Sequence, residues 1–263
     1  MIQLLLLSCL AMAEGERNAV VVSVYDGDTF TLNSGEKVRL SAVNTPELNP
    51  MELYAVEARD AAESFLMGQE VLLHLGTVER DGYGRLVAGV SVDGELLANR
   101  LLQLGLAHLF LIPPLSSSLE LEPLLASQQD AKEAGRGIWS TDGYRGDLHI
   151  TSFHANASGD DRENVNGEYL RVCNITGHPI QLEGYALENS SGGRWTLPDI
   201  TLPAGHTVKI HTGQGSHQVD AREQLAIFLG SDSPIWNNRY SKAILYNRYG
   251  QVMDVRIHQV QGY

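Results

Sequence analysis

Residues 26–47 read DGDTFTLNSGEKVRLSAVNTPE and hold the turns and strands on which our interpretation of the fold rests. Two short β-strands are expected over 29–32 and 37–43, because apolar and β-branched residues recur there on either side of the turn at 33–35. A β-branched run over 19–24 precedes them and ends at the Asp-Gly-Asp turn. The stretch therefore predicts a three-stranded meander with two carboxylates on its first turn.

The rest of the first half adds helices and further strands to this meander. Apolar residues at helical spacing predict three helices, and two more apolar runs predict strands; the helices are expected over 52–67, 96–104 and 119–133, and the strands over 71–75 and 86–92. Five strands with attached helices are typical of an OB-fold β-barrel, which presents one strand face and its loops to oligonucleotides. The pattern by itself also fits other small α+β domains.

The character of the sequence changes near Gly146. Helical periodicity ends there, and short strands alternate with turns rich in Gly, Asn, Ser and Pro. Seven such strands predict a β-sandwich; they are expected over 168–173, 180–182, 185–187, 208–211, 226–229, 243–246 and 252–257. The chain is therefore expected to hold two domains, at 19–141 and 147–260.

The first thirteen residues form a short apolar segment. Ile2 to Met12 falls far below the roughly 20 residues that a membrane-spanning helix needs, and Ala11-Met12-Ala13 has the small-x-small form of a signal-peptidase site. We interpret 1–13 as a signal peptide and expect a secreted or periplasmic protein without stable membrane insertion. A buried N-terminal strand and a lipid anchor at Cys9 are the alternatives. Removal of the signal would leave Cys173 alone, and its place in an alternating strand predicts a core position.

The charge of the chain restricts how it could bind a polyanion. The formal net charge is −13, and residues 14–147 hold 10 Lys and Arg against 21 Asp and Glu, whereas the remainder holds 9 against 11. Nucleic-acid-binding proteins usually carry a basic face, because neutralised phosphates release counterions. The composition excludes such a broad basic surface in the first half. Binding of phosphate there would need a metal ion and a few well-placed arginines.

The candidate chemistry of the first half comes from three segments. Asp26-Gly27-Asp28-Thr29 places carboxylates on a tight turn, Asn44-Thr45-Pro46-Glu47 supplies an oxygen-rich corner, and Arg39 and Arg85 supply cations. A hard cation with oxygen ligands could acidify a water. A carboxylate could orient or deprotonate that water, and arginines could hold the phosphate with paired hydrogen bonds. Each segment alone also fits a simple turn or a helix start. The combination suits metal-assisted attack on a phosphodiester.

Residues from about 20 to 140 resemble the staphylococcal nuclease (thermonuclease) family. The resemblance is carried by Asp26-Gly27-Asp28-Thr29, Val38-Arg39-Leu40, Asn44-Thr45-Pro46-Glu47, Tyr83-Gly84-Arg85, Asn99, Gly105-Leu106-Ala107 and Gly137-Ile138-Trp139-Ser140. It implies an OB-fold barrel that cleaves DNA and RNA with one bound Ca²⁺.

The resemblance also implies a set of calcium ligands. Asp28 falls on a ligating aspartate, and Thr45 falls on a residue that ligates through its backbone carbonyl. Asn44 stands where the family usually has a second ligating aspartate, so we expect it to bind the ion through its amide oxygen and with less charge. Asp26 precedes the ligand and is interpreted as a turn-forming residue.

The implied catalytic residues are Glu47, Arg39 and Arg85. Glu47 falls on the glutamate that positions or deprotonates the attacking water, and the two arginines fall on the phosphate-binding pair. Tyr83 is expected to contact the substrate. Two departures from the family's best-known member predict a rebuilt substrate pocket: residues 48–51 lack lysine, and residues 108–114 contain Phe110 but no tyrosine.

The second half, from about 148 to 260, resembles a lamin-tail domain. The motifs are Asn166-Gly167-Glu168-Tyr169-Leu170, Leu182-Glu183-Gly184-Tyr185, Leu202-Pro203-Ala204-Gly205, His211-Thr212-Gly213 and Ile235-Trp236-Asn237-Asn238. The fold class expected for the whole chain is mainly β with helices: an OB-fold barrel with three helices, followed by an immunoglobulin-like β-sandwich. The resemblance implies a binding or targeting role, with a polymer or surface as the expected ligand. We expect such a sandwich to tether the barrel without touching its chemistry.

Two functions follow from this sequence. The first is an exported, monomeric, calcium-dependent nuclease that acts on DNA and RNA. The alternative is a catalytically weak nuclease-like barrel that serves as a binding module. Two roles are also open for the tryptophans of the sandwich, Trp195 and Trp236. They could be buried anchors of the sandwich core. Alternatively, with the neighbouring Arg194 and Arg239, they could stack on a polymer.

Overall fold

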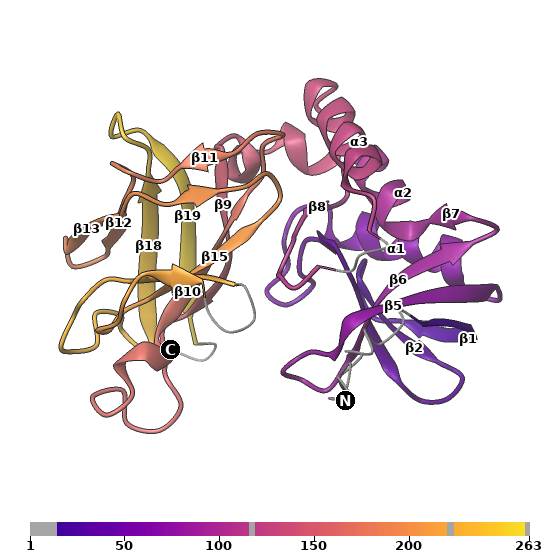
Figure 1. Cartoon of the computed structure of the whole chain (residues 1–263), viewed down its shortest axis with the longest axis horizontal. Coiled ribbons are helices and arrows are strands. Elements are labelled where there is room, and N and C mark those ends of the chain that lie inside the picture. The colour runs from indigo at the N-terminus through magenta and orange to yellow at the C-terminus, as the bar shows by residue number, and fades with distance from the viewer. Residues whose placement is uncertain (1–14, 116–118, 220–223, 261–263) are drawn as a thin grey trace, which may run out of the picture.

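Two β-rich units lie side by side in the computed structural model, which describes residues 15–115, 119–219 and 224–260 (Figure 1). The first half of the chain forms one unit and the second half forms the other. The predicted signal peptide at 1–13, with Cys9, lies outside the described residues. Within those residues, no helix is both long and apolar enough to span a membrane.

The first unit is a closed five-stranded barrel, as predicted. Its strands are β1 (Glu16–Val24), β2 (Thr29–Leu32), β3 (Lys37–Leu40), β5 (Glu70–Arg80) and β6 (Leu86–Val92), with short β4 (Val43–Asn44), β7 (Glu95–Leu96) and β8 (His108–Leu109) attached. The sheet order is β3-β2-β1-β5-β6, and parallel pairing of β3 with β6 closes it. Alternate residues such as Phe30, Val38 and Leu73 point into the barrel and are almost fully buried.

Three helices pack around the barrel: α1 (Ala55–Leu66), α2 (Leu97–Leu104) and α3 (Leu121–Glu133). Helix α1 buries Ala55, Ala58, Ala62 and Leu66, which share one face because they lie three or four residues apart. Helix α2 ends at Gly105, whose φ of 68° is left-handed. A Cβ there would lie 2.3 Å from the Arg136 carbonyl oxygen, so only glycine fits. This close approach ties the end of α2 to the chain that follows α3.

The second unit is a β-sandwich of the immunoglobulin-like kind. Its strands are β9 (Leu148–His154), β10 (Tyr169–Asn174), β11 (Ile180–Gln181), β12 (Ala186–Asn189), β13 (Arg194–Thr196), β14 (Thr201–Leu202), β15 (Thr207–His211), β16 (Gln218–Val219), β17 (Leu225–Phe228), β18 (Tyr240–Tyr246) and β19 (Val252–Gln259). One sheet has the order β16-β17-β15-β10-β9 and the other β13-β12-β18-β19, with β11 and β14 as a separate pair. Trp236 is a core anchor, because it is buried and its indole N–H donates to Thr212 Oγ1 at 3.1 Å. Trp195 is half-buried on β13.

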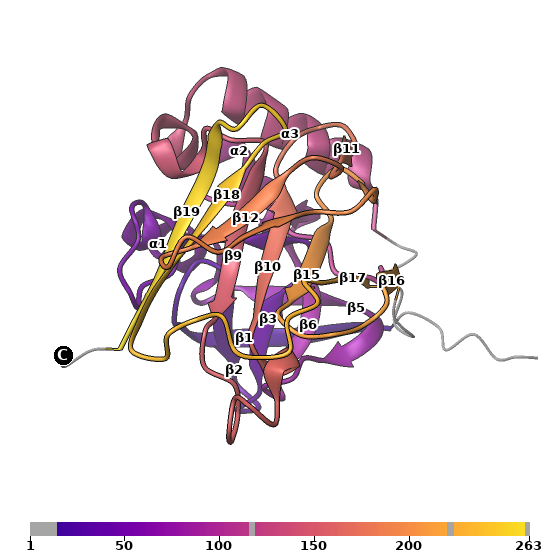
Figure 2. The same cartoon turned by 90° about the vertical axis from the view of Figure 1, so that its left-hand side faces the viewer.

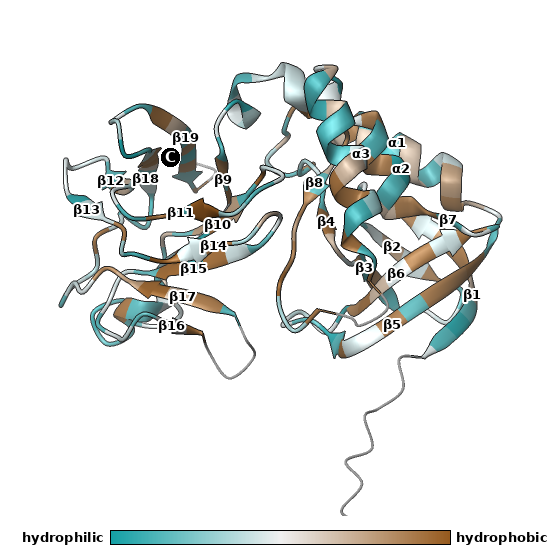
Figure 3. Cartoon of the chain, turned by 45° about the horizontal axis from the view of Figure 1, so that its top comes forward, coloured by the Kyte–Doolittle hydropathy of each residue, from teal (hydrophilic) through white to brown (hydrophobic). Residues whose placement is uncertain are grey.

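The two units share an apolar junction, visible in Figures 1 and 2 where the α3 end of the barrel meets β9 and β11. Short 3-10 helices at Gly137–Ser140 and Asp142–Tyr144 lead from the barrel into β9, and a third lies at Val165–Gly167. The junction core consists of Ala131, Ile138, Trp139, Tyr144, Cys173 and Ile175. Cys173 is therefore buried as predicted, but against the barrel, and its thiol donates to the Leu109 carbonyl at 3.1 Å. Figure 3 shows apolar stretches, in brown, on strands of both units.

Polar groups fill the rest of the junction. His108 is fully buried, and its Nδ1 lies 2.7 Å from the Leu109 carbonyl oxygen. Burial, with the nearby His149, lowers the pKa of His108 to about 3, so this ring is neutral. His149 stacks on Tyr144 with ring centroids 4.3 Å apart, and its Nδ1 lies 2.9 Å from Asp254 Oδ2. The His108 ring of the barrel also meets the His149 ring of the sandwich edge-on, with centroids 5.4 Å apart, so specific contacts as well as apolar packing join the two units.

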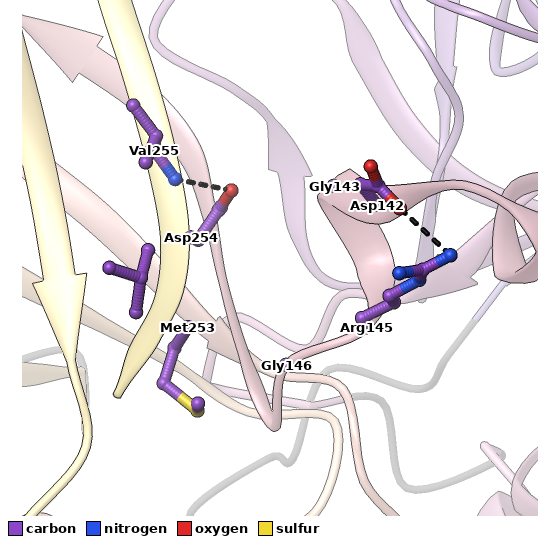
Figure 4. Close-up of a pocket in the computed structure, with 8 residues that line it drawn as sticks. Asp142, Gly143, Arg145, Gly146, Met253, Asp254 and Val255 are labelled. Carbon is purple, nitrogen blue, oxygen red and sulfur yellow. Dashed lines mark hydrogen bonds and ion pairs between the residues drawn. The ribbon is translucent and has the colours of Figure 1, made fainter. Parts of the chain in front are cut away.

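A shallow pocket lies beside this junction (Figure 4). The linking segment forms one side, where Arg145 pairs with Asp142 at 2.9 Å, and β19 forms the other. The lining residues are Asp142, Gly143, Arg145, Gly146, Val252, Met253, Asp254 and Val255. None of the predicted catalytic residues is among them, so the chemistry has to be sought elsewhere on the barrel.

Candidate active site

The Asp26-Gly27-Asp28 turn forms the centre of the site. Asp26 Oδ1 accepts a hydrogen bond from the Asp28 backbone N–H at 3.1 Å, which is the turn-forming role predicted for it. The turn packs tightly: a Cβ on Gly27 would lie 2.7 Å from Thr45 Cγ2 and 2.9 Å from Ala58 Cβ. Glycine therefore allows the turn to seat the Asp28 carboxylate against the Thr45 corner and helix α1.

Asp28 uses both carboxylate oxygens to bring the predicted residues together. Oδ2 accepts from the Thr45 backbone N–H at 2.9 Å and from its hydroxyl at 3.1 Å, and it pairs with Arg39 Nη2 at 3.1 Å. Oδ1 accepts from the Thr29 hydroxyl at 3.2 Å. Asp28 is only 5% exposed. Its partners therefore stay fixed relative to one another.

Arg39 lies across the oxygen-rich corner. Its guanidinium donates to the Val43 carbonyl and to Asn44 Oδ1, both at 2.9 Å. The Asn44 amide in turn donates to the Thr45 carbonyl at 3.3 Å. The Phe110 ring lies 5.9 Å from the guanidinium carbon of Arg39. Phe110 thus packs beside Arg39, one of the two arginines expected to bind phosphate.

Arg85 approaches the same carboxylate from the β5–β6 hairpin. Its Nε donates to Asp81 Oδ2 at 2.7 Å, and its Nη1 donates to the Thr29 hydroxyl at 3.2 Å. Since Thr29 also donates to Asp28, its hydroxyl links Arg85 to the carboxylate that Arg39 contacts directly. Tyr83 is 79% exposed, with its ring centroid 5.4 Å from the Arg85 guanidinium carbon. The predicted substrate contact is therefore free to meet a ligand that binds Arg85.

Glu47 begins a loop that closes on itself. Its backbone N–H donates to Glu52 Oε2 at 2.9 Å, and the Glu52 N–H donates back to the Glu47 carbonyl at 2.8 Å. Desolvation of its carboxyl, followed by repulsion from Asp28, Asp26 and Glu52, raises the pKa of Glu47 to about 7. Burial and Asp28 likewise raise the pKa of Asp26 to about 6. The site thus gathers more negative charge than its arginines offset.

This excess charge and the donor set suit a hard cation. Among the described residues, no three His, Cys, Asp or Glu side chains converge as a metal cluster. The set expected from the sequence is different, because it combines the Asp28 carboxylate with the Asn44 amide oxygen and the Thr45 carbonyl. Such mixed oxygen donors suit Ca²⁺, which tolerates irregular coordination. Arg39 contacts oxygens of Asp28 and Asn44, so a cation bound at this corner would share these oxygen ligands with the Arg39 guanidinium.

Comparison with known proteins identifies both halves of the chain. Residues 37–141 match the family described as staphylococcal nuclease homologue, and residues 142–260 match the lamin tail domain. The thermonuclease of Staphylococcus hyicus is 31% identical over 132 residues, which cover 48% of this chain and 77% of that protein. The chain belongs to the staphylococcal nuclease family. The thermonuclease of Staphylococcus intermedius is 31% identical over 127 residues, which cover 46% of this chain and 74% of that protein. Endonuclease YncB of Bacillus subtilis is 30% identical over 136 residues, which cover 48% of this chain and 64% of that protein. Membership supports a nuclease function at the level of the family.

Three residues that sequence reasoning did not single out belong to the site. Thr29 connects Arg85 to Asp28, and Glu52 closes the Glu47 loop. The third is Arg256 of β19, which forms an ion pair with Glu52 from the sandwich. A single hydrogen bond leaves no periodic signal in a sequence. Of these contacts, only the one between Thr29 and Asp28 could have been suspected in advance, because the two residues are adjacent in the sequence.

Proposed function

We propose that this protein is an exported calcium-dependent nuclease that hydrolyses phosphodiester bonds of DNA and RNA. The observation that carries the proposal is the contact of one buried carboxylate, Asp28, with Arg39, with Thr45 and, through Thr29, with Arg85. Glu47 lies close enough for the Asp28 charge to raise its pKa. A hydrolase acting on a phosphodiester needs cations for the phosphate and a carboxylate for the water. Both kinds of group are present at this end of the barrel.

In the proposed reaction each residue has a separate task. Glu47 orients the attacking water and accepts its proton, and its raised pKa suits a group that must exchange protons near neutral pH. Arg39 and Arg85 bind the non-bridging phosphate oxygens and offset the charge that builds up as the water oxygen bonds to phosphorus. The P–O bond to the leaving sugar oxygen then breaks, that oxygen takes a proton from solvent, and Glu47 returns its proton to solvent. Tyr83 contacts the substrate beside Arg85. Asp28, Asn44 and Thr45 would hold Ca²⁺, which when bound supplies positive charge to the phosphate and to the water.

A second candidate is a nuclease-like barrel that binds its partner but cleaves poorly. The acidic net charge of −13 and the presence of Asn44 in the expected ligand set favour it. Against it, both arginines, Glu47 and Asp28 are all present, and Asp28 contacts Arg39 directly and Arg85 through the Thr29 hydroxyl. We therefore place the nuclease first.

Digestion assays test this choice directly. Single-stranded and duplex DNA should be degraded in millimolar-range Ca²⁺, poorly in Mg²⁺ alone and not at all with chelator. Mg²⁺ requires a tighter, nearly octahedral oxygen set than an amide and a backbone carbonyl supply here. Equal rates in Mg²⁺ alone would contradict the assigned ligands, and absence of cleavage under every condition would favour the binding module.

Replacing Asn44 with Asp should tighten Ca²⁺ binding. The substitution restores a charged oxygen at a position whose side chain already accepts from Arg39, which can hold the new carboxylate in place. Calorimetric titration and the Ca²⁺ dependence of cleavage both measure the effect, which we expect to be about tenfold. Asn49→Asp is the matched control, because it adds the same charge at an exposed position in the adjacent loop. Unchanged affinity in Asn44→Asp, or an equal gain in the control, would remove Asn44 from the ligand set.

A further inference from the structure

The lamin-tail domain reaches into the loop that begins at Glu47. Arg256 on β19 pairs through Nη1 with Glu52 Oε1, and the two side chains are 23% and 22% exposed. The other oxygen of the same carboxylate, Oε2, accepts from the Glu47 backbone N–H at 2.9 Å. Glu52 therefore bridges the sandwich and the proposed catalytic loop, with one oxygen for each.

The sandwich side of this bridge is firmly anchored. Arg256 pairs with Ala243 in the β18–β19 ladder. Two residues earlier on the same strand face, Asp254 Oδ2 accepts from the Ile150 backbone N–H at 2.6 Å. Asp254 also contacts His149, whose ring stacks on Tyr144 at the barrel junction. Strand β19 is thus fixed relative to the barrel within a few residues of Arg256.

The barrel side of the bridge is less constrained. Asn49 and Pro50 are exposed, and Met51 is 65% exposed, so the loop buries little apolar surface of its own. Its two ends are held together by the reciprocal hydrogen bonds between Glu47 and Glu52. A loop of this kind depends on its few polar anchors for its position. Glu52 is the residue through which an outside element can fix it.

We propose that Arg256 is a positioning residue for the nuclease reaction, so that the lamin-tail domain completes the active-site loop. Arg256 fixes the Glu52 carboxylate, Glu52 holds the Glu47 backbone, and the Glu47 carboxyl is thereby aimed at the water. The proposal rests on the proposed function, because it assumes that Glu47 acts on the water. Misplacement of a reacting group by about 1 Å can cost about a hundredfold in rate. The effect of losing Arg256 should therefore fall on kcat, since Arg256 itself does not contact the substrate.

Substitutions in the full chain test this arrangement. Arg256→Met keeps the apolar stem and removes the charge, and we expect kcat on a short oligonucleotide to fall roughly 10- to 100-fold, with KM within about threefold. Arg256→Lys keeps a positive charge but lacks the planar guanidinium and its paired N–H donors, so its kcat should fall less than that of Arg256→Met. Arg248→Met is the matched control, because Arg248 is a sandwich arginine that donates to the Gln181 carbonyl at 2.9 Å, within its own domain. We expect the control to leave kcat unchanged.

A double-variant cycle separates positioning from general destabilisation. If Glu52 and Arg256 act as one unit, Glu52→Gln with Arg256→Met should lose no more activity than the worse single variant. Should Arg256→Met fail to fold by circular dichroism, Glu52→Gln alone decides, because it removes the same ion pair from the barrel side. A folded variant of either kind with wild-type kcat would overturn the proposal.

The same experiment keeps the two proposals apart. Glu47→Gln in the full chain should abolish cleavage if Glu47 acts on the water. An active Glu47→Gln protein would contradict the assigned role of Glu47 and, with it, the positioning role of Arg256. Loss of activity in Glu47→Gln together with normal kcat in Arg256→Met would leave the nuclease mechanism intact and remove only the role of the sandwich.

Discussion

Replacing Arg39 or Arg85 with lysine is expected to lower kcat by about two orders of magnitude or more. A lysine ammonium cannot reproduce the paired, planar hydrogen bonds of a guanidinium on a phosphate. Both arginines are held beside Asp28, either directly or through the Thr29 hydroxyl, so each presents its fork in a defined direction. Steady-state cleavage of a short oligonucleotide in saturating Ca²⁺ measures the effect.

The two variants should differ in stability. Arg39 also donates to the Val43 carbonyl and to Asn44, and its side chain is only 13% exposed, so Arg39→Lys should lower the free energy of unfolding by about 1–3 kcal/mol. Arg85 is more exposed and should tolerate lysine with little change. Arg80→Lys is the matched control on the hairpin of Arg85, because Arg80 pairs with Glu36 outside the site. Near wild-type kcat in a folded Arg39 or Arg85 variant would remove that arginine from the mechanism.

The regular elements of the barrel were largely predictable from the sequence. The strands expected over 29–32 and 86–92 have those bounds in the structure, because turns with strong signals flank them. The strand expected over 37–43 instead ends at Leu40, because Ala42 adopts a φ of 69° and the chain then pairs with β8. Left-handed backbone at an alanine carries no sequence signal of the kind that glycine gives.

The start of the first helix also differs from the prediction because of a left-handed backbone position. Periodicity predicted a helix from residue 52, but α1 begins at Ala55, because Tyr54 has a φ of 70° and Glu52 is used to close the Glu47 loop. The strands β9, β13, β14 and β16 of the sandwich were not predicted. All but β9 are two or three residues long, too short for alternation to mark them.

The candidate site was predictable where residues are close in sequence or carry a family motif, and not where a tertiary contact alone defines the role. The place of Asp28 among the calcium ligands stays a prediction, but the structure brings Asp28 into contact with Thr45 and Arg39, two other residues expected at the site. Glu52 and Arg256 lie 204 positions apart, in different domains. Their pairing depends on how the two domains dock, which no local pattern records.

The expectation that the sandwich tethers the barrel without touching its chemistry stays a prediction, but the docking shows that the two domains share an interface. Alternation on β10 and β15 places Cys173 and Thr207 on the sheet face opposite Val172 and Val208, whose side chains are in the sandwich core. That outer face would ordinarily meet water, but here it contacts the β8 segment of the barrel through Leu109 and Leu111. The sandwich therefore packs directly against the barrel, and the Glu52–Arg256 ion pair extends this interface to the Glu47 loop.

We therefore expect truncation of the chain after Arg145 to lower the free energy of unfolding of the barrel by about 3–6 kcal/mol. The free energy of unfolding of a typical domain is about 5–15 kcal/mol. The truncation removes Cys173 and Ile175 from the junction core and uncovers Leu111, and each buried apolar side chain of that size contributes about 1.5–3 kcal/mol. It also removes the Gly205 carbonyl and the Thr207 N–H, which pair with the Leu111 backbone. Those backbone groups can bond to water instead, so their loss adds less than the apolar term.

Urea unfolding followed by circular dichroism, on the full chain and on the fragment ending at Arg145, measures this loss. A separately produced fragment over 146–260 is the matched control: added in trans, it should rebuild the junction and raise the midpoint of the truncated barrel. If the barrel keeps its fold, its kcat should fall as in Arg256→Met, because the truncation also removes the arginine that fixes Glu52. A truncated barrel with the midpoint and the kcat of the full chain would show that the junction contributes neither stability nor positioning.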